Sequence, residues 1–199
     1  MLWQHLTVSQ LPSSLVSARL ELHLFQQDDL EALATAVQES IEHLAPWMAW
    51  WVAEEPLSRE DQLARIDRWH QEWADGKSTV YGVFREGVVI GSVGFLFRSA
   101  DGTVREIGYW LHPDHVGHGY ATEASRVVVD AAFMRLPYVQ RVEIRHDKAN
   151  DPSAGVPRRL GFTYVGETAR EKTAASPAGV DWVWAVNREG WTESQHARP

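Results

Sequence analysis

The segment Val116–Ala124 reads VGHGYATEA and joins a strand predicted to end at Leu111 to a helix predicted to begin near Tyr120. Two of its residues, Gly117 and Gly119, stand just before the helix. Glycines at such a turn let consecutive backbone N–H groups converge, and the helix N-terminus adds partial positive charge. The segment therefore predicts an anion site that suits a pyrophosphate, although a glycine pair can also serve only as a helix entry.

Two common phosphate-binding motifs fit this segment poorly. A P-loop requires Lys followed by Ser or Thr after its second glycine, whereas Tyr120-Ala121 follows here. A dinucleotide fingerprint requires a third small residue where Thr122 stands, and an acidic residue at the end of the next strand. Glu143 lies in the middle of that predicted strand instead. The turn is therefore better explained by a third class of coenzyme motif.

Hydrophobic periodicity predicts the elements on both sides of the turn. The predicted strands are Ala18–Phe25, Thr79–Arg85, Val88–Phe97, Val104–Leu111, Arg141–Arg145, Phe162–Gly166 and Asp181–Asn187. The predicted helices are Asp28 or Asp29 to Ser40, Ser58–Ala74, Tyr120–Arg135 and Ser153–Leu160. The order β-α-α-β-β-β-α-β-α-β-β combines antiparallel hairpins with one central β-α-β unit. We therefore expect an α/β fold of the α+β kind, with a mixed, mostly antiparallel sheet flanked by helices.

Local signals support several of these bounds. Ser58 and Asp61 approximate a capping box at the start of a helix. The pair Glu86-Gly87 is a tight-turn signal between two predicted strands. The closing sequence TESQHARP, residues 192–199, has almost no apolar content, so we expect it to fray.

The composition is that of a soluble globular protein, with 44% hydrophobic and 23% charged residues in 199. We expect one domain over residues 1–199, with its core over about 18–191. The absence of cysteine excludes disulfides, thiolate nucleophiles and Cys-ligated metals. Neither a secretory signal nor a membrane-spanning run is visible, so we expect a cytoplasmic protein without a membrane partner. The net charge of −8 argues against nucleic-acid binding and suits a cationic substrate such as an amine.

Four ordered motifs carry a family resemblance. They are EIGYWL at Glu106–Leu111, GHGYATEA at Gly117–Ala124, N-x-x-S at Asn150 and Ser153, and RLGF at Arg159–Phe162. In this order and spacing, the chain resembles the GNAT superfamily of N-acetyltransferases over about residues 19–191, and within it the RimJ/RimL-like ribosomal-protein branch. The coenzyme motif of that superfamily, Gln/Arg-x-x-Gly-x-Gly/Ala, is matched by Gly119 and Ala121, with Val116 at its first position.

The resemblance implies an enzyme that moves an acetyl group from acetyl-CoA, its cosubstrate, to a primary amine by direct attack in a ternary complex. The amine belongs to a protein N-terminus or to a small molecule, and no metal is implied. Whether the chain is a monomer or a homodimer stays open. The alternative is a CoA-binding regulatory or interaction module that has lost catalysis.

The resemblance also implies roles for individual residues. The pantetheine arm should lie between the strands Val104–Leu111 and Arg141–Arg145, with backbone N–H groups near Trp110 and Leu111 facing the thioester carbonyl. Asn150 should bind the pantetheine, and Ser153 should donate a proton, or a hydrogen bond, to the departing thiolate. The alternative is that Ser153 only caps its helix, and both roles can hold together. The residues expected around the phosphates are Val116, Gly117, His118, Gly119, Tyr120, Ala121 and Thr122.

Glu106 is the first candidate for the general base, acting through water. An acid inside an otherwise apolar strand is costly unless it is used or paired. The alternative for Glu106 is therefore a salt bridge to Arg105 or Arg145, and the alternative base is Glu171.

The connector HLAPWMAWW is too apolar for a free loop, so Trp47, Trp50 and Trp51 must pack on something. Aromatic faces attract ammonium groups, and we expect at least one of the three to border the acceptor pocket. The alternative is that all three belong to the core.

Three histidines stand close together in the chain, His112, His115 and His118. They lie in a loop broken by Pro and Gly without a fixed ligand geometry, so we expect no metal site there. His118 could instead add charge near phosphates.

Overall fold

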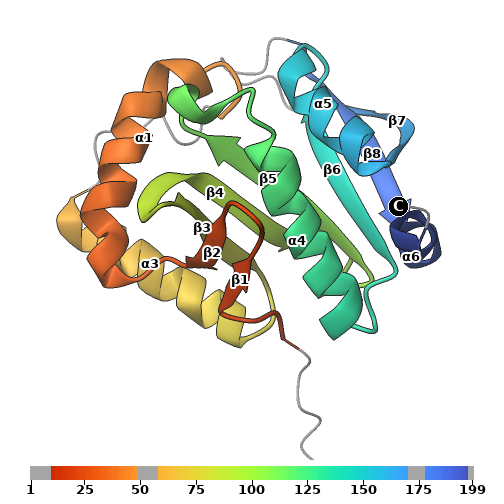
Figure 1. Cartoon of the computed structure of the whole chain (residues 1–199), viewed down its shortest axis with the longest axis horizontal. Coiled ribbons are helices and arrows are strands. Elements are labelled where there is room, and N and C mark those ends of the chain that lie inside the picture. Colours follow the sequence, from red (N-terminus) through yellow and green to blue (C-terminus); the bar gives the residue numbers. More distant parts are fainter. Residues whose placement is uncertain (1–9, 49–57, 170–177, 197–199) are drawn as a thin grey trace, which may run out of the picture.

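The computed structural model describes residues 10–48, 58–169 and 178–196. Its strands form one sheet in the order β1-β2-β3-β4-β5-β6-β8-β7 (Figure 1). Among the described strands, β5 and β6 form the parallel pair, and the other neighbours run antiparallel. The strands are β1 Ser14–Val16, β2 Glu21–Leu24, β3 Thr79–Arg85, β4 Val88–Phe97, β5 Val104–Leu111, β6 Arg141–Asp147, β7 Thr163–Ala169 and β8 Val180–Asn187. The expected mixed, mostly antiparallel sheet is confirmed.

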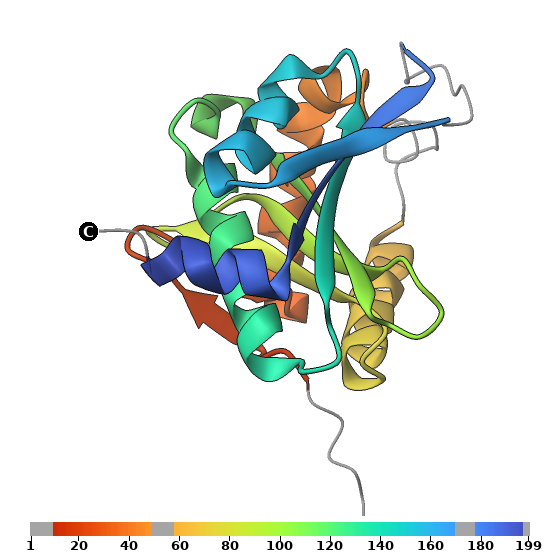
Figure 2. The same cartoon turned by 90° about the vertical axis from the view of Figure 1, so that its right-hand side faces the viewer.

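Helices cover both faces of this sheet. They are α1 Leu30–Leu44, α3 Arg59–Ala74, α4 Tyr120–Arg135, α5 Asp151–Leu160 and α6 Arg188–His196, with the short 3₁₀ helices η1 Gln27–Asp29 and η2 Pro113–His115. Figure 2 shows α4, α5 and α6 on one side of the sheet and α3 on the other. None of the helices within the described residues is long and apolar enough to cross a membrane.

Local sequence fixes the bounds of the central elements. The predicted ranges of β3, β4, β5 and α4 agree with the structure. Between β3 and β4, Glu86 has φ 53° and Gly87 has φ 79°, the left-handed pair that a tight hairpin turn requires. At the start of α3, the Ser58 hydroxyl accepts a bond from the Asp61 N–H, which confirms the predicted cap.

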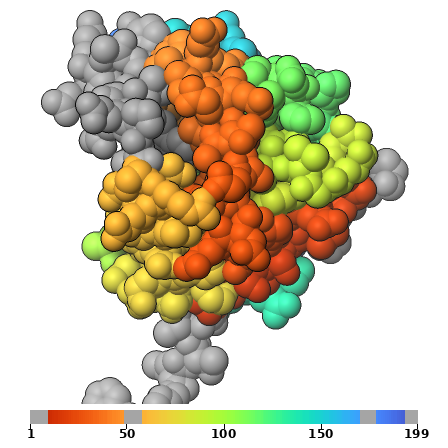
Figure 3. All heavy atoms as spheres, turned by 90° about the vertical axis from the view of Figure 1, so that its left-hand side faces the viewer, coloured from red at the N-terminus to blue at the C-terminus, as the bar shows by residue number. Residues whose placement is uncertain are grey.

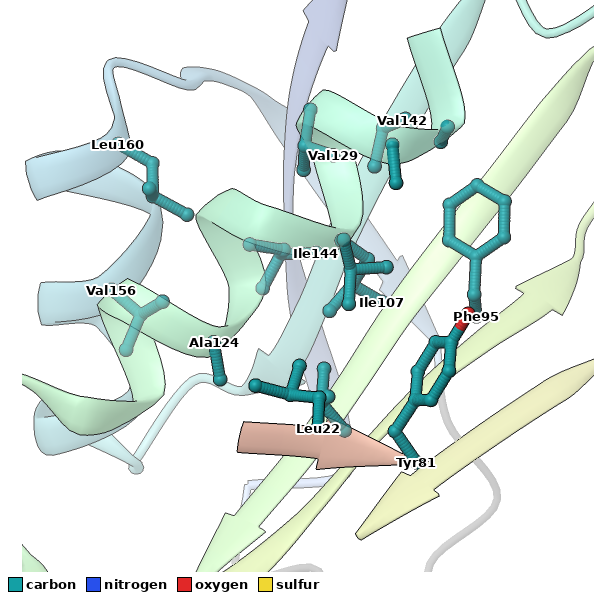
Figure 4. Packing of buried hydrophobic residues seen from close by; sticks show 14 of the residues in the cluster. Leu22, Tyr81, Phe95, Ile107, Ala124, Val129, Val142, Ile144, Val156 and Leu160 are labelled. Atoms are coloured by element: carbon teal, nitrogen blue, oxygen red, sulfur yellow. The ribbon is translucent and has the colours of Figure 1, made fainter. Parts of the chain in front are cut away.

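The larger core lies between the sheet and the helices α4 and α5. Ala124, Val128 and Ala132 form a fully covered stripe along α4, as the helical period predicts. Figure 4 shows this helix against Ile107 and Ile144 of β5 and β6, with side chains of α5 packed on its far side. The core therefore holds the β5-α4-β6-α5 unit rigidly at the centre of the molecule.

A second core lies under α1 and α3, on the opposite face. Leu33 of α1 and Ile66 of α3 are fully buried there against Phe25 and Phe84. Trp110 of β5 joins the same cluster. α1 and α3 cover much of the face that is drawn in Figure 3. The two cores place β5 between them, so its alternate side chains serve both.

The N-terminal strand differs from the prediction. The run Ala18–Phe25 is not one strand, because the Ser17 N–H and the Leu20 carbonyl close a turn at 2.9 Å. β2 therefore begins only at Glu21, and the chain before the turn forms the additional strand β1. Alternation of apolar residues continues through a tight turn, so the pattern alone did not reveal the break.

The predicted fraying of residues 192–199 is wrong for its first part, because α6 continues to His196. Trp191 anchors this helix: its side chain is buried, it lies edge-on to Phe162, and its indole N–H donates to Asp130 at 2.7 Å. Arg188 holds the start of the helix, donating to the carbonyls of Leu136 and Val139 at 2.7 and 2.6 Å. Two long-range anchors thus order a segment whose composition is polar.

We predict that Trp191→Ala lowers the free energy of unfolding by about 3–5 kcal/mol, the usual cost of removing a buried Trp side chain. Chemical denaturation of the two proteins measures this difference. The neighbouring Thr192→Ala, at an exposed position, is the control and should stay within about 0.5 kcal/mol of the parent. Equal stability of all three proteins would show that α6 does not contribute to the core.

Candidate active site

The site begins where two strands part. β5 and β6 share hydrogen-bonded register only from Val104 opposite Arg141 to Ile107 opposite Ile144. Beyond that point β5 continues to Leu111 on β4, and β6 continues to Asp147 on β8. A cavity of about 1210 Å³ opens at this fork, and it extends from the start of α4 to the faces of α1 and α3. The fork leaves backbone groups of both strands without a strand partner, ready for an extended ligand.

The glycine turn forms one end of the cavity. Gly117 and Gly119 have φ of 79° and 80°, a conformation that glycine adopts without strain. Gly119 is the N-cap of α4 and has no side chain with which to cap the first N–H groups of that helix. These donors, together with the helix dipole, favour an anion at the start of α4, so the phosphate site there stays a prediction. The residues from Val116 to Thr122 all line the cavity, as the phosphate prediction requires.

Sequence reasoning missed the support behind this turn, which is Arg19. Its guanidinium binds Glu123 of α4 at 2.7 Å and the His118 carbonyl at 3.1 Å, and it stacks 4.7 Å from the Tyr120 ring centre. Glu123 also accepts a bond from the Ser17 hydroxyl at 2.7 Å. Burial alone would raise the pKa of Glu123. The bonds from Ser17 and Arg19 outweigh burial and hold that pKa below its usual value. Arg19 therefore fixes the turn through its backbone and its first helical turn.

The start of α5 lies across the fork. Asn150 is the N-cap, and its side-chain oxygen accepts from the Ser153 N–H at 3.2 Å. The alternative prediction that Ser153 caps this helix is wrong. Asn150, three residues earlier, is the cap, and Ser153 stands in the first turn. Both residues line the cavity. Arg159, near the end of α5, donates to the Thr122 hydroxyl at 3.2 Å. It therefore brings a cation beside the first turn of α4.

Tyr109 is a second residue that the sequence did not single out. Its hydroxyl lies 3.0 Å from the Ser153 hydroxyl and 3.1 Å from the Ser153 carbonyl, so β5 and α5 meet at this point of the fork. Burial raises the pKa of Tyr109, which keeps its hydroxyl protonated and able to donate. Tyr109 is thus placed to orient the Ser153 hydroxyl. The alternation of β5 could have indicated it, since Tyr109 faces α4 and α5 like Ile107.

Glu106 is almost buried in the cavity wall and is ion-paired. Arg98 and Arg145 both approach its Oε2 atom, Arg145 at 3.4 Å. Arg145 also binds Glu143, which lies opposite Glu106 in the parallel register, at 2.7 Å. The predicted pairing with Arg145 is confirmed. Pairing with Arg105 is wrong, because Arg105 points to the other face.

Small residues open the middle of the cavity. Val80, Gly94 and Gly108 lie side by side across β3, β4 and β5. A Cβ atom built on Gly108 would meet nothing within 4 Å, so the cavity is open above Gly108. Trp47, half-buried in the turn that follows α1, lines the same space, and its place beside the acceptor stays a prediction.

His146 of β6 also lines the cavity, but in a fixed neutral form. The Trp184 indole N–H donates to its Nε2 at 3.0 Å, so its proton resides on Nδ1, 2.9 Å from the Asp147 carbonyl. Burial lowers the pKa of this imidazole. Both ring nitrogens are therefore occupied by structural bonds.

Three predicted residues, Trp50, Trp51 and Glu171, lie outside the described residues. Within residues 10–48, 58–169 and 178–196, no three His, Asp or Glu side chains could jointly hold a metal ion. His112 instead lies 3.2 Å from Glu39, and His118 sits beside Tyr120 at the glycine turn. In chemical terms, the cavity joins an anion site, a fork that can hold an extended arm, and a wall of paired charges.

Comparison with known proteins supports this interpretation. Residues 19–163 match the family described as Acetyltransferase (GNAT) domain. The chain is 28% identical over 153 residues to the putative ribosomal N-acetyltransferase YdaF of Bacillus subtilis (strain 168), covering 76% of this chain and 82% of that protein. It is 33% identical over 140 residues to the probable N-acetyltransferase YjcK of the same organism, covering 66% and 71%.

The fold is also shared with a solved structure. RimL, a ribosomal L7/L12 alpha-N-protein acetyltransferase in complex with coenzyme A, superimposes with a TM-score of 0.77. The sequence identity is 20%, and the match covers 89% of this chain and 97% of RimL.

The buried neutral His146 predicts a pH dependence of stability. Its pKa in the folded state lies below the ordinary value of 6.5, so its contribution to stability is present above that value and is lost as the pH falls through the folded pKa. We predict that His146→Gln lowers the melting temperature at pH 7.5 but flattens its decline toward pH 5. The exposed His43→Gln is the control and should keep the parent slope. A parallel pair of curves for His146→Gln and the parent would contradict the assignment.

Proposed function

Because the chain belongs to the GNAT acetyltransferase family, we propose that it transfers an acetyl group from acetyl-CoA to a primary amine. The main support is one observation: the uncapped glycine turn of α4 and the fork between β5 and β6 open into the same cavity. A pyrophosphate fits the first feature, and an extended pantetheine arm fits the second. The reaction then needs an amine to enter from the side of α1 and α3.

In this proposal the coenzyme contacts follow the cavity wall. The phosphates lie on the backbone from Val116 to Thr122, with Arg159 beside them. The pantetheine arm lies along the fork, where Asn150 has its side-chain nitrogen left for a ligand after capping α5. Backbone N–H groups near Trp110 and Leu111 face the thioester carbonyl and stabilise the developing oxyanion.

Two side chains handle protons in the proposed direct attack of the amine on the thioester. Glu106 accepts the amine proton through a water at Oε1, since both arginines engage its other oxygen, Oε2. Ser153 donates a hydrogen bond to the thiolate as the C–S bond breaks, with Tyr109 holding the serine hydroxyl in place. Glu171 remains the alternative base. Trp47 borders the incoming amine.

We propose the α-amine of a protein N-terminus as the acceptor, and a small-molecule amine as the alternative. The support is the similarity to YdaF, whose name is that of a putative ribosomal N-acetyltransferase. The test is a thiol-release assay of the full chain with acetyl-CoA against N-terminal peptides, polyamines and aminoglycosides. Thiol release with at least one amine is expected. Binding of acetyl-CoA without release in any arm would instead favour a CoA-binding module that has lost catalysis.

We predict that Gly119→Glu abolishes acetyl-CoA binding, because it places a carboxylate at the end of α4 where the phosphates should lie. Isothermal titration calorimetry measures the loss, expected to exceed about a hundredfold in Kd, or about 2.7 kcal/mol. Gly87→Glu is a matched control, since Gly87 has nearly the same φ of 79° but lies in the β3–β4 turn away from the cavity. An unchanged Kd in folded Gly119→Glu would remove the phosphates from this turn.

We predict that Glu106→Gln lowers kcat by about two to four orders of magnitude, as for the loss of a general base, and leaves the Kd for acetyl-CoA unchanged. Steady-state kinetics and calorimetry measure the two quantities. Glu143→Gln is the control, because Glu143 shares Arg145 with Glu106 but does not line the cavity. Normal turnover of Glu106→Gln would transfer the role of base to Glu171 or to water.

A further inference from the structure

We propose that the acceptor carries a negative charge close to its reactive amine, and that four arginines of the cavity recognise it. These residues are Arg65 and Arg68 of α3, Arg98 at the end of β4 and Arg145 of β6, and together they are called the arginine wall. The inference rests on the proposed function, since it names the class of amine that enters the same site. An acidic protein N-terminus is the acceptor that we favour.

The pair on α3 provides the first argument. Arg65 and Arg68 are three residues apart, so they share a face of the helix, and both line the cavity. The Arg65 guanidinium lies 5.4 Å from the ring centre of Trp69, which holds it against the wall. Burial and the nearby charge of Arg68 lower the pKa of Arg65. The α3 face therefore presents two guanidinium groups to the cavity.

The pair on the sheet provides the second argument. Arg98 and Arg145 both approach one oxygen of Glu106, so two guanidiniums meet one carboxylate atom at the fork. Each guanidinium has five N–H donors; Arg98 donates from Nε to Glu106, and Arg145 donates from Nε and Nη2 to Glu143. The side chain of Arg98 is 42% exposed and lines the cavity, so its Nη groups are accessible. A carboxylate on the acceptor can bind these donors while its amine lies near Glu106.

The charge balance of the cavity provides the third argument. Five arginines of residues 10–48, 58–169 and 178–196 line it, the arginine wall and Arg159, in a chain whose net charge is −8. The acids that line it within the described part of the chain are Glu72, Glu106, Asp147 and Asp181. Their bonds are already structural in part: Glu72 accepts from the Ser78 hydroxyl at 2.5 Å, and Asp147 accepts from the Ala149 N–H at 2.8 Å. Asp181 lies near Arg98 and attracts it. Among the described lining residues arginines therefore outnumber acids, whereas the whole chain is acidic.

The test uses the full chain with saturating acetyl-CoA and two peptides that differ only in charge. One begins Ser-Asp-Glu-Gly, the other begins Ser-Asn-Gln-Gly, and both are amidated at the C-terminus. The expected result is a kcat/KM at least about tenfold higher for the acidic peptide, the usual effect of a charged hydrogen bond. The preference should shrink as NaCl is raised, because salt screens exposed charges. Equal kcat/KM values for the two peptides would overturn the proposal.

Two variants test whether the arginine wall causes the preference for the acidic peptide. Arg68→Gln should lower kcat/KM for the acidic peptide by about tenfold and leave the neutral peptide within about twofold. Arg59→Gln is the matched control, since it removes the same charge from the same helix outside the cavity, and it should change neither value. Equal losses for both peptides in Arg68→Gln would show a structural role and would contradict the proposal.

Two further arms separate this inference from the function on which it rests. Free aspartate tests the small-molecule source: a higher kcat/KM for aspartate than for either peptide supports an anionic acceptor and replaces the protein N-terminus with an amino acid. A neutral or basic amine that is acetylated as well as the acidic peptide overturns the inference while the proposed function stands. Absence of thiol release with every acceptor, in a protein that binds acetyl-CoA, overturns both.

Discussion

β5 and β6 stop sharing hydrogen bonds after Ile107 and Ile144, and the whole site follows from that separation. Backbone groups away from strand partners are costly when they are buried, so the fork can persist only where a ligand or water reaches it. The two strands stay apart because each is held on its outer side, β5 by β4 and β6 by β8. α4 packs against β5 and β6 beneath the fork, and the helix therefore begins at the wall of the cavity.

The sequence predicted the parts of the fold that local chemistry decides. β3 to β5 and α4 have strong periodicity and clear glycine or capping signals at their ends. The C-terminal helix was not predicted, because it is held by Trp191 and Arg188, whose partners lie far away in the chain. Composition over a short window cannot reveal such anchors. The start of β2 was predicted too early for a different reason. The alternation of apolar and polar residues continues through the tight turn at Ser17 to Leu20.

The candidate site shows the same division between local and distant information. The glycine turn and the first turn of α5 were visible as motifs, and the structure brings them to one cavity. The partner of Glu106 was only half predicted. Arg105 could have been excluded by strand alternation, since adjacent residues of a strand point to opposite faces. Arg98 could not have been identified without the pairing of β4 with β5, which places the end of one strand beside the start of the other.

Arg19 connects the edge of the sheet to the glycine turn across about a hundred residues of chain. This contact makes the conformation of the turn a property of the complete fold, and a fragment that contained only the β5-α4-β6 unit would lack it. By thermodynamic linkage, any molecule that binds the ordered turn also stabilises the N-terminal strands, even though it never touches β2. Ligand binding at the turn therefore also stabilises the β1–β2 edge of the sheet. The free energy of local opening at that edge should rise when the central site is occupied.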